Sequence, residues 1–153
     1  AVGHRRWILY PNTQRMGTGD IPSGSGGSAS NALWVFDYDN IWGSRPDTRS
    51  AYVAWPPPGY VPRDLIFPRW SFSYPQADFS AAAAVVTRSG TPVGVTLSPV
   101  VNGFGDNTLV WELAESLPAG EVTYSVTVSN VVINGQAQTF TYEVTAFDAS
   151  ESE

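Results

Sequence analysis

The stretch Glu121–Phe147, EVTYSVTVSNVVINGQAQTFTYEVTAF, decides the fold of this chain. Apolar and polar residues alternate on both sides of its centre, which is the pattern of β-strands with one buried face. At the centre, Asn134-Gly135 is the dipeptide that most favours a two-residue hairpin turn, because both positions of that turn require a positive φ. The stretch therefore predicts antiparallel pairing of strands at 122–128, 131–133 and 139–147.

The sequence that precedes this hairpin shows the same strand pattern. Trp70, Phe72 and Tyr74 alternate with serines, and further strands are expected at 82–87, 93–97 and 108–113. No helical segment interrupts them. The number and spacing of these strands predict a mainly β fold, an antiparallel immunoglobulin-like β-sandwich over residues 69–148, with a flexible tail at 149–153.

Residues 41–68 differ in composition from the strands that follow them. This segment holds six of the prolines, three of them consecutive at Pro56–Pro58, so it is unsuited to a helix or a central strand. We expect an ordered Pro/Trp-rich linker that packs on a surface through its aromatic rings. A ligand groove or a partner-binding proline motif is the alternative interpretation.

Residues 1–40 predict a short helix that ends near Tyr10, followed by strands at 16–21 and 32–38. The Gly/Ser-rich loop PSGSGGSASN, residues 22–31, connects the two strands. One helix and a two-stranded hairpin are marginally stable in water without a covering layer. We therefore expect this segment to dock on the β-sandwich, on a second copy of the chain, or on an N-terminal partner.

Composition excludes several partners. The 153 residues carry eight Arg, no Lys and a net charge of −6, which disfavours nucleic acid because phosphate binding needs clustered cations. Cysteine is absent, which excludes disulfides, and no apolar run is long enough for a membrane span. The low charge and the high Gly, Ser, Trp and Tyr content are typical of extracellular or cell-surface β modules.

The opening residues carry a family resemblance. The segment GHRRWILYP followed by MGTG resembles the bacterial, SCP-like extracellular form of the CAP superfamily, in which a Gly-His-Arg helix precedes a Gly-x-Gly strand; the matching residues are Gly3, His4, Arg5, Ile8, Leu9, Pro11, Met16, Gly17 and Gly19. The resemblance implies that residues 1–40 are the C-terminal helix and hairpin of a CAP α-β-α sandwich. It also implies that His4, with Arg5 and Arg6, lines a binding cleft. The family's other cleft His and its acidic partners have no counterpart here.

Candidate chemistry is sparse. His4 is the only histidine and no Gly-x-Ser-x-Gly motif is present, so we expect no catalysis by this chain alone. Asp37, Asp39 and Asp106 are candidate oxygen ligands for calcium, with turn formation as the alternative role. We expect no other cofactor.

The leading functional hypothesis is a non-catalytic binding or scaffold portion of a secreted bacterial CAP-superfamily protein. One alternative is a carbohydrate-binding or adhesion module that uses Trp42, Trp55, Tyr60 and Trp70, because exposed rings stack on sugars. Another is part of a hydrolase whose site is completed by another chain. The expected partners are an N-terminal CAP portion or a second copy, with a glycan or a lipid as open ligands.

Overall fold

The computed structural model describes residues 2–24 and 27–149 of the chain. Ala1, two residues of the predicted Gly/Ser-rich loop and residues 150–153 of the predicted tail lie outside this range. The described chain is mainly β and divides into two compact units, Gly3–Arg49 and a larger unit that begins at Ser50.

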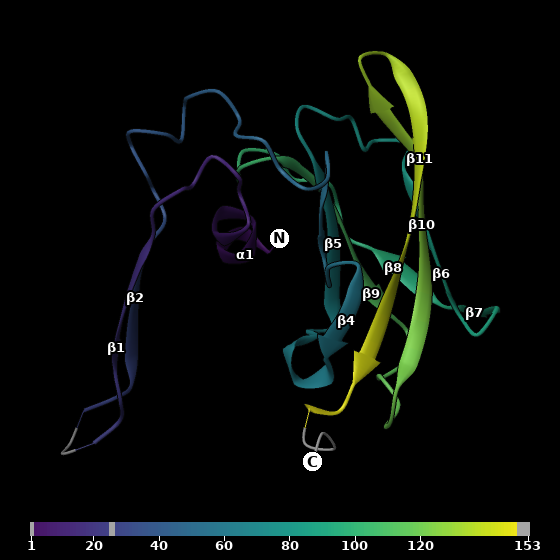
Figure 1. Cartoon of the computed structure of the whole chain (residues 1–153), viewed down its shortest axis with the longest axis horizontal. Helices are drawn as coiled ribbons and strands as arrows, with labels where there is room; N and C mark the ends of the chain where they lie inside the picture. Colours follow the sequence, from purple (N-terminus) through teal and green to yellow (C-terminus); the bar gives the residue numbers. More distant parts are fainter. Residues whose placement is uncertain (1, 25–26, 150–153) are drawn as a thin grey trace. The chain divides into compact units, whose positions relative to one another are not determined.

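Two sheets form the larger unit, in agreement with the predicted β-sandwich (Figure 1). One sheet has the strand order β4-β11-β10-β6-β7 and the other β3-β5-β9-β8. All strand pairs are antiparallel except β4 with β11. The strands are β3 (Val53–Trp55), β4 (Gly59–Pro62), β5 (Arg69–Tyr74), β6 (Ala83–Arg88), β7 (Thr91–Val93), β8 (Val95–Leu97), β9 (Asn107–Leu113), β10 (Val122–Ile133) and β11 (Gln136–Phe147).

The core of the larger unit lies between the two sheets. Trp70 and Trp111 come from the four-stranded sheet and Tyr124 from the five-stranded sheet, and all three are at most 1% exposed. Around Phe72 the rings of Tyr52 and Phe140 lie 4.8 and 5.1 Å away between centroids. This aromatic cluster joins the two sheets.

The decisive hairpin has the predicted turn. Asn134 and Gly135 have φ of 50° and 77°, and Ile133 pairs directly with Gln136. The strand before the turn is longer than expected, because β10 continues through residues 129 and 130. Its register shifts there, and Asn130 takes a φ of 56°, so the predicted break is a local irregularity within one strand.

The strand predicted at 93–97 serves both sheets. Its first residue, Val93, belongs to β7, which pairs with β6. Its last three residues form β8, which pairs with β9. The change of sheet occurs at Gly94, where an added Cβ would lie 2.9 Å from the Cβ of Ala114. A residue without a side chain is therefore required where the chain crosses between the layers.

Residues 41–68, which we expected to be a linker, contribute two strands and the short 3-10 helix η1 (Arg63–Leu65). Both strands lie at sheet edges: β3 beside β5, and β4 beside β11. Proline is tolerated at an edge because one side of the strand needs no backbone donor. The proline-rich composition therefore predicts the edge position rather than the absence of strands.

The smaller unit consists of α1 (Gly3–Ile8) and the hairpin of β1 (Gly17–Ile21) with β2 (Ser30–Trp34) (Figure 1). The second strand ends earlier than predicted. Residues 35–38 leave the ladder because Asp37 turns inward and bonds to another segment of the chain. Among the apolar side chains of this unit, Val35 and Ile41 are buried.

Candidate functional site

The hairpin of the smaller unit has two faces of different chemistry. On one face Asn31 donates to the side chains of Thr18 and Asp20, at 3.0 and 2.7 Å. Leu33, which pairs with Thr18, shares this face. The polar groups here bond to one another, which is what a solvent-facing surface requires.

The opposite face of the hairpin is apolar and flat, and we call it the hairpin face. The register places Gly17 opposite Trp34, Gly19 opposite Ala32 and Ile21 opposite Ser30, all with side chains on this side. Ile21 and Trp34 are 66% and 49% exposed. An added Cβ at either glycine would meet no atom within 4 Å, so the backbone of β1 is open to close approach.

Two further rings extend the exposed apolar surface beyond β2. Phe36 and Tyr38 are exposed and alternate with the buried Val35 and Asp37, so they point outward as Trp34 does. Phe36 and Tyr38 stack with ring centroids 6.3 Å apart, and Trp7 of α1 lies 5.0 Å from Phe36. The rings are therefore held in place rather than free to collapse onto the unit.

Asp37 fixes the segment that presents these rings. One of its carboxylate oxygens accepts hydrogen bonds from the backbone N–H groups of Gln14 and Arg15, at 3.2 and 3.0 Å, and from the side chain of Asn40 at 2.8 Å. The Asn40 bond, with the two backbone bonds, outweighs desolvation and holds the pKa of Asp37 below its usual 3.8. The carboxylate thus ties residues 14–15 to residues 37–40.

Lowering the pH is expected to loosen this segment. Because the folded-state pKa of Asp37 is depressed, its stabilising effect is complete above the unfolded-state pKa of about 3.9 and is lost as pH falls through the folded value. The protection factors of the Gln14 and Arg15 amides, which are corrected for the intrinsic pH dependence of exchange, should therefore fall below that pH. Asp37→Asn should exchange fast at neutral pH, and equal protection in both proteins would contradict this role.

The predicted calcium ligands do not come together. Asp37 directs its oxygen at Gln14, Arg15 and Asn40, whereas Asp39 forms an exposed ion pair with Arg15 at 3.2 Å. Asp106 belongs to the other unit. Within residues 2–24 and 27–149, no group of three or more His, Cys, Asp or Glu is arranged to hold a metal ion.

The candidate binding residues are also dispersed. On α1, His4 is exposed, Arg5 is half-buried and Arg6 is only 5% exposed, so the three do not present one common surface. Trp42 is exposed in the smaller unit.

The other candidate rings belong to the larger unit. Trp55 is half-buried in β3, whereas the exposed Tyr60 in β4, on the other sheet, has Phe147 at 6.3 Å between ring centroids. Trp70 is only 1% exposed. These three rings therefore do not form one exposed surface on which a sugar could stack.

The residues of the hairpin face were not predicted from the sequence. In the sequence, these residues occupy alternate positions: Ser30, Ala32 and Trp34 in one strand, and Gly17 and Gly19 in the other. This alternation indicates a common face only once the register of the hairpin is known. The Gly/Ser-rich segment 22–31, which runs into the start of β2, obscured this alternation.

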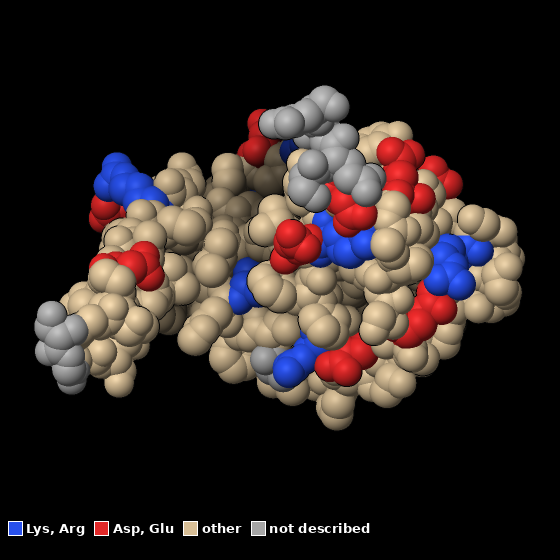
Figure 2. Space-filling view, turned by 90° about the horizontal axis from the view of Figure 1, so that it is seen from below, with Lys and Arg blue, Asp and Glu red and all other residues tan. Residues whose placement is uncertain are grey.

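Each arginine of the larger unit pairs with a carboxylate. Arg63 with Asp148, Arg69 with Glu112 and Arg88 with Glu115 form ion pairs of 2.8 to 3.1 Å. On the face drawn in Figure 2, several blue groups lie beside red ones. Separately, the described part of the chain contains no helix that is long and apolar enough to span a membrane.

Comparison with known proteins identifies no family for this chain. No family model and no curated protein matches the chain. Among solved structures, it is similar to PcoC, a methionine-rich copper resistance protein from Escherichia coli, with 19% identity over 61% of this chain and 92% of that chain, at a TM-score of 0.47. A selenomethionine PcoC structure matches with 20% identity over 66% and 99% of the two chains, at a TM-score of 0.49.

These findings overturn our functional hypotheses. The similar structures are copper resistance proteins, so the assignments as a CAP-superfamily scaffold portion, as a carbohydrate-binding or adhesion module, and as part of a hydrolase are wrong. The cofactor expectation, none or calcium, is wrong for the same reason, and the dispersed Asp37, Asp39 and Asp106 give its physical cause. This chain has one Met, one His and no Cys. The CAP resemblance of the opening residues stays a prediction.

Proposed function

We propose that the smaller unit mediates self-association, with the hairpin face of one copy packed against the hairpin face of a second copy. The observation that carries this proposal is the contrast between the two faces of one hairpin. Thr18, Asp20 and Asn31 satisfy one another on the polar face, whereas Ile21 and Trp34 are exposed on the other. A two-stranded hairpin gains stability when its apolar face is covered.

The chemistry of the hairpin face suits an identical surface. The chain has a net charge of −6, but the hairpin face contains no charged side chain. Packing two copies of this face together therefore places no like charges against each other. In a two-fold interface the same patch contacts itself, and the glycines of β1 leave room for the Trp34 ring of the other copy. Steric fit and charge thus both permit self-pairing.

The available area indicates a weak dimer. From the exposed fractions of Ile21, Trp34, Phe36 and Tyr38, and about 150–250 Å² for each large side chain, roughly 500 Å² per copy is available. Two copies would bury about 1,000 Å², near the lower limit for a specific interface. We therefore expect a dissociation constant on the order of 10 µM.

Sedimentation equilibrium of the chain and of Trp34→Ser tests the proposal. The chain should show a concentration-dependent dimer, and Trp34→Ser should raise the dissociation constant about 30-fold, as loss of a central aromatic residue does. Leu33→Ser, one residue along the same strand on the opposite face, is the matched control and should leave the constant unchanged. Equal effects of the two substitutions, or a wild-type chain that stays monomeric, would overturn the proposal.

Other occupants of the face give distinct results in the same experiment. A monomeric chain that co-floats with neutral phosphatidylcholine vesicles would assign the face to a lipid surface. A monomer whose hairpin amides are nevertheless protected from exchange would assign it to the larger unit. A chain that stays monomeric alone but forms a complex with a separately supplied N-terminal CAP portion would support the family resemblance in place of self-association.

We also propose that the protein works outside the cell or at its surface. The low charged fraction and the high Gly, Ser, Trp and Tyr content support this location. Fractionation of the producing cells, followed by detection of the chain, tests it, and recovery in the cytosol alone would contradict it.

A further inference from the structure

One edge of the five-stranded sheet is only partly covered by β4. This strand pairs with residues 144–147 of β11. Within residues 2–24 and 27–149, no segment hydrogen-bonds to the backbone of β11 at 136–143 on the side away from β10. Figure 1 shows β4 beside the C-terminal end of β11, away from the hairpin turn. Pro56–Pro58 directly precede β4 and have no N–H groups to donate, which ends the pairing there.

The uncovered part of β11 presents backbone N–H and C=O groups at this open edge. Successive residues of a strand direct these groups to opposite sides, and Gln136, which pairs with Ile133 across the turn, directs its own toward β10. The residues that face the open edge are therefore Ala137, Thr139, Thr141 and Glu143. All four are exposed, whereas Thr145, the next residue in the same row, lies against β4 and is only 8% exposed.

Side chains of two kinds border the open edge. Thr139, Thr141 and Glu143 are exposed on the outer face of the sheet, and Phe140, on the core side, is half-buried. Side chains on neighbouring strands lie about 5 Å apart between Cβ atoms, so a strand added here would be read by these four residues. Apolar side chains suit the position beside Phe140, and a cation suits the position beside Glu143.

Glu143 is available to such a cation. Its Oε1 atom accepts a hydrogen bond from Ser125 Oγ at 3.1 Å, and within the described part of the chain it forms no ion pair. Thr141, its neighbour on the same face, bonds to Thr127 at 3.3 Å between hydroxyl oxygens. The only charge along the open edge is therefore a negative one.

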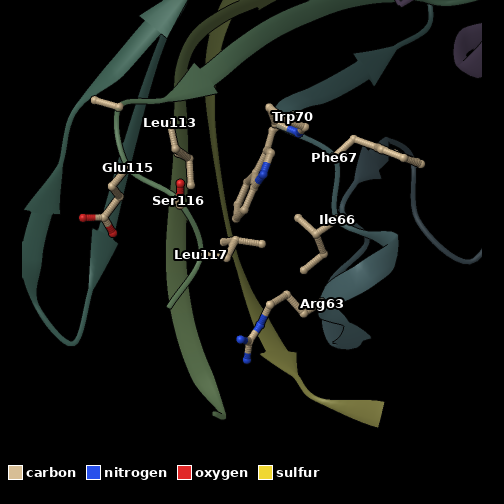
Figure 3. Close-up of a pocket in the computed structure, with 10 residues that line it drawn as sticks. Arg63, Ile66, Phe67, Trp70, Leu113, Glu115, Ser116 and Leu117 are labelled. Carbon is tan, nitrogen blue, oxygen red and sulfur yellow. The ribbon is translucent and has the colours of Figure 1, made fainter. Parts of the chain in front are cut away.

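The larger unit as a whole is acidic. Between residues 50 and 149 it has three Arg and eight Asp or Glu, a formal charge of −5. All three Arg are already paired, including Arg63 with Asp148 and Arg88 with Glu115; Arg63 and Glu115 line the pocket drawn in Figure 3. The remaining negative charge attracts a cationic partner and repels a second copy of this unit.

We infer that the open edge of β11 binds an extended cationic peptide segment of another protein as an added strand. The partner's backbone bonds to the four edge-facing residues, and one of its basic side chains lies beside Glu143. In this mode of recognition main-chain hydrogen bonds provide affinity, and the alternating side chains provide selectivity. The site belongs to the larger unit and does not depend on the hairpin face.

Titration of the full chain with a blocked peptide of alternating lysine and valine, about seven residues long, tests the inference. The amides of Ala137, Thr139, Thr141 and Glu143 should gain protection from hydrogen exchange, because each becomes hydrogen-bonded. At low ionic strength, a peptide with glutamate in place of lysine should bind at least tenfold more weakly. No added protection at millimolar peptide, or equal affinities for the two peptides, would overturn the inference.

Two N-methylated forms of the lysine–valine peptide isolate the backbone contribution. Because alternate N–H groups of a strand face opposite sides, methylation of one alternate set, either the lysines or the valines, should abolish binding. Methylation of the other set should leave the affinity nearly unchanged. Equal affinities of the two methylated peptides would contradict binding as an added strand.

Two substitutions locate the peptide on β11. Glu143→Gln should weaken binding about threefold at low ionic strength, the effect of one exposed ion pair. Glu121→Gln is the matched control, because it removes the same charge at an exposed residue outside the open edge and should leave the affinity unchanged. Thr141→Pro removes one edge-facing N–H, which an edge strand tolerates, and should weaken binding about tenfold.

Unchanged affinity in Glu143→Gln and in folded Thr141→Pro would overturn the assignment to β11, and the methylated peptides decide the matter if Thr141→Pro does not fold. Edge amides that are protected in the free chain and lose this protection on dilution would assign the edge to a second copy instead, which also overturns the inference. Because Trp34→Ser lies in the other unit, its outcome is independent of these titrations.

Discussion

Phe72→Ala is expected to lower the free energy of unfolding of the larger unit by about 3–5 kcal/mol, the range for removal of a fully buried aromatic ring. Phe72 is 0% exposed and lies between the two sheets. Four rings surround it at centroid distances of 4.8 to 6.4 Å: Tyr52, Phe79, Phe140 and Tyr142. These neighbours come from separate segments and cannot all close the resulting cavity. Since small domains are stable by only about 5–15 kcal/mol, the variant should be close to unfolding.

Urea denaturation followed by amide signals of β10 and β11 measures this loss in the larger unit alone. Phe67→Ala is the matched control, because the same ring is 58% exposed there and its removal should change stability by less than about 0.5 kcal/mol. If Phe72→Ala were no more destabilising than Phe67→Ala, the two sheets would not be joined through this aromatic cluster.

The sequence was most informative where local chemistry alone determines structure. Asn134-Gly135 predicts its turn because positive φ is required at both positions, and the alternation in 139–147 places a strand where β11 lies. Mainly β architecture and the two-layer sandwich follow from the same pattern, and both are confirmed by the two sheets of the larger unit.

Where tertiary pairing decides, the sequence was less informative. Residues 93–97 were predicted as one strand, yet the chain changes sheets at Gly94, where the position of Ala114 makes the crossing tight. Likewise, Pro62 ends an edge strand that pairs in parallel with β11, a partner some eighty residues away in sequence. Nothing local to either segment specifies those partners.

In the candidate site, too, single residues could be picked out from the sequence, but the surface that depends on strand pairing could not. Isolated features such as His4 and the acidic pair Asp37 and Asp39 were conspicuous in the sequence, but Asp37 serves to join two segments. By contrast, the hairpin face depends on which residues stand opposite one another across β1 and β2. Its glycines, opposite Ala32 and Trp34, had no distinguishing feature until the register was known.

Ala32→Cys should place a reactive thiol at the centre of the proposed dimer contact. Ala32 is exposed, pairs with Gly19 in the middle of the hairpin, and shares the hairpin face with Trp34. The chain has no cysteine of its own, so the introduced thiol is the only one that reacts. Leu33→Cys is the matched control, because the neighbouring residue is also exposed but faces the opposite side.

Cross-linking of these two variants tests self-association through the hairpin face most directly. A bismaleimide whose reach is about the 10 Å spacing of packed sheets should join Ala32→Cys into covalent dimers at least tenfold faster than Leu33→Cys, with the excess lost when Trp34→Ser is added. Equal cross-linking rates for Ala32→Cys and Leu33→Cys, at protein concentrations above the dissociation constant, would contradict the proposed dimer.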